Sequence, residues 1–295
     1  MVEGSTDWTK KGKIEDGKVE IVVESVRPLP PEVALLFSEG IHHLRAILDN
    51  VVWQLLVGEQ GEIADRVAWL VEFPIKENQD EFSKWLTKRT KRLFATCGSR
   101  KLADRIKTLQ PFVDTMQEVG SFSERLAHLS DQDPHLEHPL RLLRAYSNQD
   151  KHRQLRLTAA RSVILKDSVS IFQQDRSFSR IEVGSVIDKL DESAREGYEI
   201  STAIMLQRPG NEDVWVGPAR ELSSLRRYVS DIAVPILLKG LEVPGLLPPV
   251  IGLGDTGQDF LERLDAAGTE DAIERLEEMS SRTYIEAMLE KPTFL

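Results

Sequence analysis

EVALLFSEGIHHLRAILDNVVWQLLVG, residues 32–58, is the stretch that decides the fold. Its apolar residues recur every three or four positions, a spacing that places side chains on one face of a helix. They are Ala34, Leu35, Phe37, Ile41, Leu44, Leu48, Val51, Val52 and Leu55. The pattern predicts a core helix of about seven turns that ends near Gly58. Paired prolines in the preceding RPLPPEV favour extended structure followed by a helix start.

The segments on either side of this helix differ in the spacing of their apolar residues. KVEIVVESV, residues 18–26, alternates and is β-branched, which predicts a strand. VEFPI, residues 71–75, indicates a short extended anchor. Helical periodicity then predicts helices over about 79–93, 99–109 and 112–129, and another that begins near His138-Pro139 and carries residues 143–152.

Beyond residue 155 the period becomes alternating, which predicts strands. The segments are RLTAARSVILK, DSVSIFQQ, SRIEVGSV, EISTAIML and the shorter DVWVG. A polar or helical DKLDESAREG separates the third from the fourth. Pro218 then opens a core helix, ARELSSLRRYVSDIAV, which Pro235 interrupts or kinks. One strand, a helical run and a strand run indicate an α+β fold rather than alternating βαβ units.

The predicted architecture is therefore a helical bundle of up-and-down helices, a small and mostly antiparallel sheet, and an acidic helical tail. The expected boundaries are 1–29 for an N-terminal strand segment, 30–157 for the helical bundle, 158–240 for a β-rich segment with its closing helix, 241–258 for a Pro/Gly linker and 259–295 for the tail. Because its linker is rich in proline and its charge is one-sided, we expect the tail to be separable from the core.

Composition places the chain among ordinary globular proteins, since 41% of its 295 residues are hydrophobic and 29% are charged. The single cysteine, Cys97, excludes an intramolecular disulfide and a cysteine-cage zinc site, so a cytoplasmic location is the simplest expectation. No apolar run is long enough for a membrane span and the first residues lack a secretory signal, so no membrane partner is expected.

The net charge of −10 is unevenly distributed. Residues 255–290 contain eleven Asp/Glu and three Arg, a net of −8, whereas residues 84–107 contain nine Lys/Arg and one Asp, a net of +8. The basic run is either a solvated helix face or a nucleic-acid-binding surface formed by Lys88, Arg89, Lys91 and Arg92. The acidic tail would take a basic partner, either this run or a second protein.

Two polar clusters interrupt the apolar periodicity. LRAYSNQDKHRQLRL, residues 143–157, holds Arg144, Asn148, Asp150, Lys151, His152 and Arg153, and residues 41–55 hold His42, Arg45 and Asp49. Polar groups at this density are costly to bury without partners, which makes them site candidates. At 100° per residue, Arg144, Asn148 and His152 lie within 80° of each other on one helix face.

Both clusters belong to motifs that resemble a widespread uncharacterised bacterial helical family, with H-x-L-R-x-x-L-D-x-x-x-W-x-L in one helix and N-x-D-K-H-R later. The first motif falls on His42, Leu44, Arg45, Leu48, Asp49, Trp53 and Leu55, and the second on Asn148, Asp150, Lys151, His152 and Arg153. The resemblance covers residues 20–155 and carries no activity with it.

A looser resemblance is to HEPN domains, helical bundles of which many are metal-independent ribonucleases in bacterial defence and toxin systems. Their signature is an Arg, often followed by a polar residue, and then a His four to six residues further on. This chain departs from it, because seven residues separate Arg144 from His152, and Asn148 has no Arg immediately before it. The resemblance implies a helical bundle and a defence or toxin ribonuclease.

The residues themselves offer a usable set for RNA cleavage. His152 would move a proton to or from the 2′-hydroxyl or the leaving oxygen, Arg144 or Arg153 would stabilise the phosphorane charge, and Asn148 would orient the phosphate or the imidazole. His42, Arg45, Asp49, Asp150 and Lys151 would support them. The alternative is a non-catalytic interaction or scaffold protein of a defence or phage-related complex, in which Arg45, Asp49, Asp150 and Arg153 form a buried ion network between two helices.

No metal or cofactor is expected, because the histidines of HLSDQDPHLEH, residues 128–138, lack the His-x-x-x-His spacing of a helical metal site. GLGDTG after Ile251 has the wrong glycine spacing for a dinucleotide loop. The tryptophans Trp53, Trp69 and Trp85 are interpreted as core or boundary residues. The partners that this interpretation allows are RNA, a second copy of the chain in a homodimer, and a basic protein for the tail.

Overall fold

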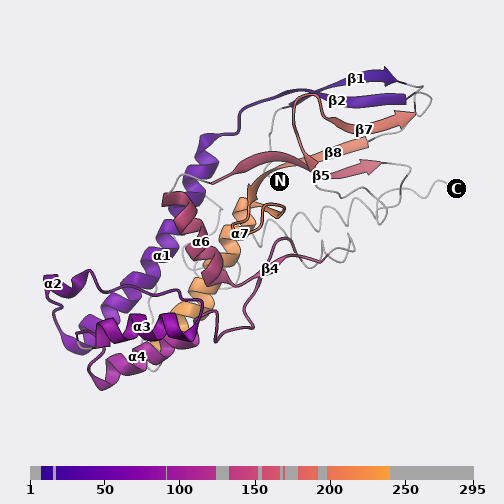
Figure 1. Cartoon of the computed structure of the whole chain (residues 1–295). Coiled ribbons are helices and arrows are strands. Elements are labelled where there is room, and N and C mark those ends of the chain that lie inside the picture. The colour runs from indigo at the N-terminus through magenta and orange to yellow at the C-terminus, as the bar shows by residue number, and fades with distance from the viewer. Residues whose placement is uncertain are drawn as a thin grey trace, which may run out of the picture. The chain divides into compact units, whose positions relative to one another are not determined.

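The computed structural model of the chain describes residues 8–15, 18–90, 92–123, 133–151, 155–166, 169, 179–191 and 198–239 (Figure 1). All of these residues belong to one compact unit, Gly4–Lys239. The expected linker and acidic tail lie outside the described residues. Within them, helices and antiparallel strands occur together, which confirms the α+β class and a small antiparallel sheet.

Among the described residues, helices occur mainly between residues 31 and 151, and again between 218 and 238. The helices are α1 (Pro31–Gln60), α2 (Asp65–Ala68), α3 (Gln79–Thr90), α4 (Cys97–Thr108), α6 (Pro139–Lys151), α7 (Pro218–Arg227) and α8 (Val234–Leu238). Pro31 starts α1, because proline suits the first helical turn, where its missing N–H would have no partner. Gly61 ends the helix with a φ of 79°. No helix among the described residues is long and apolar enough to cross a membrane.

Helix α1 lies at the centre of the helical core. It buries Phe37, Ile41, Leu44, Leu48, Val52 and Leu56, close to the predicted stripe. Leu35, which the stripe included, is exposed. Helix α6 packs on α1, with the rings of Phe37 and Tyr146 5.0 Å apart. Gly40 lets α7 approach α1 closely, because a Cβ at this position would lie 2.6 Å from a methyl carbon of Leu222.

The strands form two larger antiparallel sheets and one short pair. They are β1 (Trp8–Glu15), β2 (Lys18–Val26), β3 (Val119–Gly120), β4 (Leu136–Glu137), β5 (Leu157–Lys166), β6 (Ser179–Arg180), β7 (Val186–Asp191), β8 (Tyr198–Gln207) and β9 (Trp215–Val216). One sheet has the order β1-β2-β7 and the other β6-β5-β8-β9, and β3 pairs with β4. The N-terminal strand thus belongs to a sheet with a strand from the second half of the chain.

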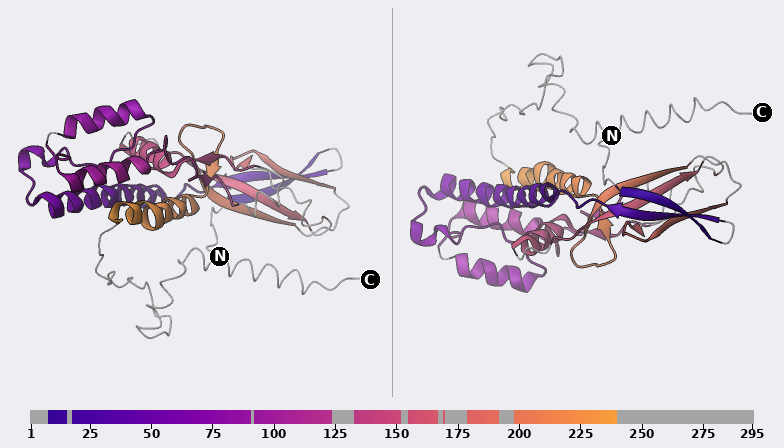
Figure 2. Two further views of the ribbon diagram at one scale, coloured as in Figure 1. Left: turned by 90° about the horizontal axis from the view of Figure 1, so that it is seen from below. Right: turned by 90° about the horizontal axis from the view of Figure 1, so that it is seen from above.

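The two larger sheets share a small apolar core, and both views of Figure 2 show them stacked. Ile21 and Val23 of β2 pack there with Ala159 of β5 and with Ile181 and Ile187. The chain passes from one sheet to the other between β6 and β7. Gly184, with a φ of 87°, makes the turn and donates its N–H to the Val23 carbonyl at 2.8 Å.

Two predicted elements are wrong in detail. SRIEVGSV was predicted as one strand but is split by the turn at Gly184, and the following DKLD, which was interpreted as polar or helical, belongs to β7. The helix predicted over 112–129 is absent from its described part, 112–123, which holds turns and β3. Instead, the N–H groups of Val113 and Asp114 donate to the Gln110 carbonyl at 2.8 and 2.9 Å in a turn, and Val119 and Gly120 pair with β4.

Pro235 affects the last helix as its chemistry dictates. Proline cannot donate a hydrogen bond to the preceding turn. A π-helical segment, η2 (Tyr228–Ala233), therefore lies between α7 and α8, and the helix continues through Pro235 to Leu238. Such an insertion is a common way for a helix to accommodate a local break in its ladder.

A fully buried ion pair joins the helices to the sheet of β8. Arg208 follows β8 and donates to the Glu221 carboxylate of α7 at 2.7 and 2.9 Å, and both side chains are at most 1% exposed. The Tyr146 hydroxyl of α6 donates to the same carboxylate at 3.0 Å, and Arg208 also donates to the His135 carbonyl at 2.7 Å. Burial, and secondarily the charge of Glu221, raises the pKa of Tyr146.

Replacing Arg208 by Met should lower the free energy of unfolding by about 3–5 kcal/mol, because Glu221 is left as an unpaired buried charge. Urea denaturation measures the effect. Lys88→Met is the matched control: it removes an exposed cation that has no ion pair within the described residues, so the expected change is within about 0.5 kcal/mol. Equal losses in the two variants would contradict the prediction.

Candidate functional site

Three members of the predicted polar clusters, Arg45, Asp49 and Arg144, bind an extended segment, residues 70–77 (LVEFPIKE), which links α2 to α3. Its residues Leu70, Phe73 and Ile75 are buried among the helices. The segment has no strand partner in the described part of the chain. Buried backbone N–H and C=O groups must nevertheless be hydrogen-bonded. Side chains of the surrounding helices supply these bonds.

Helix α1 binds both polar groups of one residue in this segment. The Asp49 carboxylate accepts a hydrogen bond from the Phe73 N–H at 2.7 Å, and the Arg45 guanidinium donates to the Phe73 carbonyl at 3.2 Å. Arg45 and Asp49 lie 3.8 Å apart, one helical turn from each other. The L-R-x-x-L-D motif therefore has a structural role. Its leucines, Leu44 and Leu48, face the core, and its charged pair binds the backbone of Phe73.

Gln110, just after α4, provides the hydrogen bonds that a neighbouring strand would otherwise give to Pro74 and Lys76. Its amide oxygen accepts from the Lys76 N–H at 2.9 Å, and its amide nitrogen donates to the Pro74 carbonyl at 3.0 Å. The same nitrogen also reaches the Ile106 carbonyl at 3.0 Å. Because Gln110 is fully buried, these bonds have no competition from water.

Arginines of α3 and α6 complete the contacts. Arg89 donates to the Leu70 carbonyl at 2.9 Å and to Glu72 at 2.6 Å. Arg144 donates to the Ile75 carbonyl at 3.3 Å and pairs with Glu77. We refer to Arg45, Asp49, Arg89, Gln110 and Arg144, with the segment that they hold, as the backbone clamp.

The structure places the members of the expected catalytic set differently. Arg144 is part of the backbone clamp, and Asn148 is exposed on α6. Asp150 accepts a hydrogen bond from Ser38 at 2.5 Å. The side chain of Lys151 and all of His152 and Arg153 lie outside the described residues.

Asp49 and Asp150, two members of the ion network considered from the sequence, do not contact each other. Asp49 holds Phe73, whereas Asp150 is bound at Ser38, roughly 16 Å from Asp49 along the axis of α1 by helical rise. The helices are neighbours, but the charged groups meet partners at different levels. His42 is exposed on α1, and its ring centre is 6.3 Å from that of His43.

The proposed nucleic-acid set is also divided by the structure. The Arg89 side chain is only 11% exposed because it belongs to the clamp, and it lies over the Trp85 ring at 5.1 Å. Lys88 and Arg92 are exposed, and Lys91 lies outside the described residues. The exposed cations of this region, which we call the basic surface, are Lys84, Lys88, Arg92, Arg100 and Lys101. Within the described residues none of them has an ion pair.

The sequence analysis considered His138 only as a metal ligand and missed its structural role. His138 directly precedes α6, and its Nδ1 accepts the N–H of Leu140 at 3.1 Å, so it caps the helix. In this neutral tautomer Nε2 carries the proton, and Nε2 is buried with no hydrogen-bond partner in the described part of the chain. Its position directly before Pro139 and an apolar helix is the signal that was available in the sequence.

Among the described residues no three His, Cys, Asp or Glu side chains are placed to hold a metal ion. His128 and Asp131 of the loop considered for a metal lie outside them. Comparison of the chain with protein-family models, with curated proteins and with solved structures gave no match.

Gln110→Ala should lower the free energy of unfolding by at least about 1–3 kcal/mol, since it leaves the Pro74 carbonyl and the Lys76 N–H buried without partners. Denaturant titration and amide hydrogen exchange at Lys76 measure the loss. Asn148→Ala, an exposed amide on α6, is the control and should change stability by less than about 0.5 kcal/mol. An unaffected Gln110→Ala variant would show that the clamp does not stabilise the fold.

Stability should fall as the pH drops below about 6.5, through His138. Burial lowers the pKa of His138 from its ordinary 6.5, and the charge of Arg141 adds to this against the opposing effects of Asp114, Glu137 and Glu77. The unfolded chain therefore binds a proton that the folded chain does not, and stability is present above pH 6.5 and lost below it. Protonation would also place a hydrogen on Nδ1 and break the cap.

His138→Asn keeps an acceptor for the Leu140 N–H but does not titrate. Melting temperatures measured between about pH 5 and 8 should decline less steeply on the acid side for this variant than for the wild type. Parallel pH profiles would assign the acid sensitivity to other groups.

Proposed function

We propose that the chain is a non-catalytic interaction protein that binds a polyanionic partner, RNA above all, through its basic surface, in the reducing cytoplasm that a single cysteine favours. The backbone clamp is the observation that supports a non-catalytic role. Arg45, Asp49 and Arg144, which a shared catalytic site would need, are engaged with the backbone of residues 70–77. Moving any of them toward a substrate would leave a buried backbone group without its partner.

The basic surface supports the polyanionic partner. Its five cations lie on or next to α3 and α4, two helices that are anchored by the same core through Trp85, Leu102 and Ile106. Cations on rigid helices suit a partner with regularly repeated negative charge, because the backbone that carries them is already ordered and binding has to order only their side chains. Their exposure keeps them hydrated, so we expect binding to be strong at low salt and to weaken steeply as salt is added.

The ribonuclease remains a second candidate because of one feature of α6. Asn148 is exposed on α6, four residues before His152 in the sequence, so its amide is accessible to a phosphate. On this hypothesis His152 and Arg153 act without Arg144. His152→Ala would then abolish cleavage of single-stranded or transfer RNA, and any toxicity on expression, by a factor of about 100 to 10,000 in rate, and EDTA would have no effect.

The binding proposal is tested by titrating the full chain into a labelled single-stranded RNA and following its anisotropy at several salt concentrations. Replacing both Lys84 and Lys88 by Glu should weaken binding and reduce the slope of log K against log salt, by about 1 for each lost phosphate contact. Lys18→Glu combined with Arg27→Glu is the control, because it changes the net charge equally at exposed residues before α1.

The two pairs of substitutions separate a local surface from a general effect of charge. Equal weakening in both variants would indicate non-specific attraction and contradict the proposal. The RNA recovered after each titration also reports on the second candidate. RNA that stays intact with the wild type would exclude the ribonuclease, and RNA cut by the wild type but not by His152→Ala would overturn the non-catalytic proposal.

A further inference from the structure

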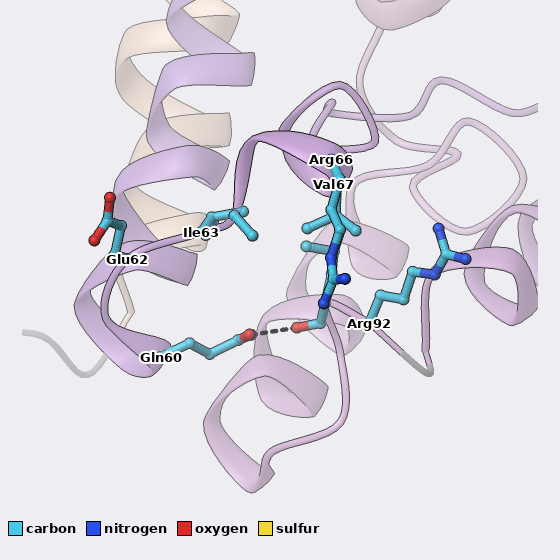
Figure 3. Close-up of a pocket in the computed structure, with 8 residues that line it drawn as sticks. Gln60, Glu62, Ile63, Arg66, Val67 and Arg92 are labelled. Carbon is cyan, nitrogen blue, oxygen red and sulfur yellow. Dashed lines mark hydrogen bonds between the residues drawn. The ribbon is translucent and has the colours of Figure 1, made fainter.

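A hollow of about 620 Å³ lies where the end of α1, the short helix α2 and the residues after α3 meet (Figure 3). Its lining includes Gln60, Glu62, Ile63, Arg66, Arg92 and Leu93. Gln60 donates to the Leu93 carbonyl and so ties the end of α1 to the chain beyond α3. The volume suits a small ligand or one unit of a polymer.

The hollow carries a positive balance at its rim. Arg66 and Arg92 are exposed, and Figure 3 shows both of them across the hollow from Glu62. Neither arginine has an ion pair in the part of the chain that the structure describes. Two guanidinium groups held by different elements can bind a phosphate from two directions, with paired N–H donors on each.

Trp69, directly after α2, adds an aromatic surface beside the hollow. Its side chain is 73% exposed, although the sequence suggested a core or boundary position. The indole Nε1 donates to the carbonyl of Arg66 at 3.0 Å, which fixes the ring against the backbone of a residue that lines the hollow. An indole with its only donor satisfied and most of its surface in solvent offers its faces for stacking.

We infer that this hollow binds one nucleotide unit of a single-stranded nucleic acid, with the phosphate on Arg66 and Arg92 and the base stacked on Trp69. The inference rests on the proposed function, since Arg92 also belongs to the basic surface. That continuity favours a repeating polyanion over a single phosphorylated peptide, which would need no cations on α3 and α4. A single strand is required because the base faces of a duplex are covered by their neighbours.

The test uses the full chain and labelled single-stranded oligonucleotides of about 12 nucleotides, a length within the range of such sites. One probe has bases throughout, and a second has the same sugar-phosphate chain with the bases removed. Trp69→Ala should weaken binding of the first probe roughly 5- to 100-fold and leave binding of the second unchanged. Trp69→Phe should retain most of the affinity, because it keeps an aromatic face.

The arginines should behave in the complementary way. Arg66→Gln with Arg92→Gln should weaken both probes and reduce the salt dependence of both. Met116→Ala, which removes another highly exposed apolar side chain, is the control and should have no effect on either probe.

The outcomes distinguish the inference from the function on which it rests. If the wild type binds the probes and heparin but Trp69→Ala binds the first probe as tightly as the wild type, the stacking site is wrong and the polyanion-binding proposal stands. If neither the probes nor heparin bind at low salt, both are wrong. A phosphotyrosine peptide that displaces the oligonucleotide at lower concentration than unlabelled oligonucleotide would overturn the inference in favour of a protein partner.

Discussion

An extended chain buried among helices creates a hydrogen-bonding problem, and much of this structure is its solution. Residues 70–77 bring several backbone groups into the core, and no strand of the described ranges pairs with them. Each group left unsatisfied would cost about 1–3 kcal/mol, which is a large fraction of the stability of an ordinary domain. Side chains from α1, α3 and α6, together with Gln110, must therefore reach one segment at once. This requirement restricts how those helices pack, beyond what their apolar faces specify.

The same requirement explains why the polar motifs resembled a catalytic site. A side chain that binds a buried backbone carbonyl must be long and must donate, and one that binds an N–H must accept, so the clamp uses arginine, aspartate and glutamine. Catalysis selects the same residue types. The sequence predicts that Arg45, Asp49 and Arg144 need partners, but it does not indicate that the partners are backbone atoms of residues 70–77, because those contacts join segments far apart in the chain.

Other differences between expectation and structure have the same origin. The core face of α1, strand β2 and the start of α6 follow from local patterns, and the structure confirms them. Strand β1 is not predicted, because its sequence WTKKGKIE is rich in lysine, and it forms by pairing with β2. The break at Gly184 and the exposure of Trp69 also depend on tertiary neighbours. Sequence alone therefore gave the polar residues of the candidate site but neither their assignment to the clamp nor the hollow beside Trp69.

The pairing of β2 with β7 has a consequence for synthesis of the protein. Lys18 of β2 lies opposite Asp191 of β7, so β2 can pair with β7 only after the intervening helices have been synthesised. Contacts of such high sequence separation slow folding, and an unpaired strand edge is a site of aggregation while the chain is incomplete. Strand β1 pairs with β2 locally and occupies one of its two edges from the start. The other edge of β2, which later pairs with β7, stays unpaired during synthesis and is therefore the edge that we expect a nascent-chain chaperone to bind.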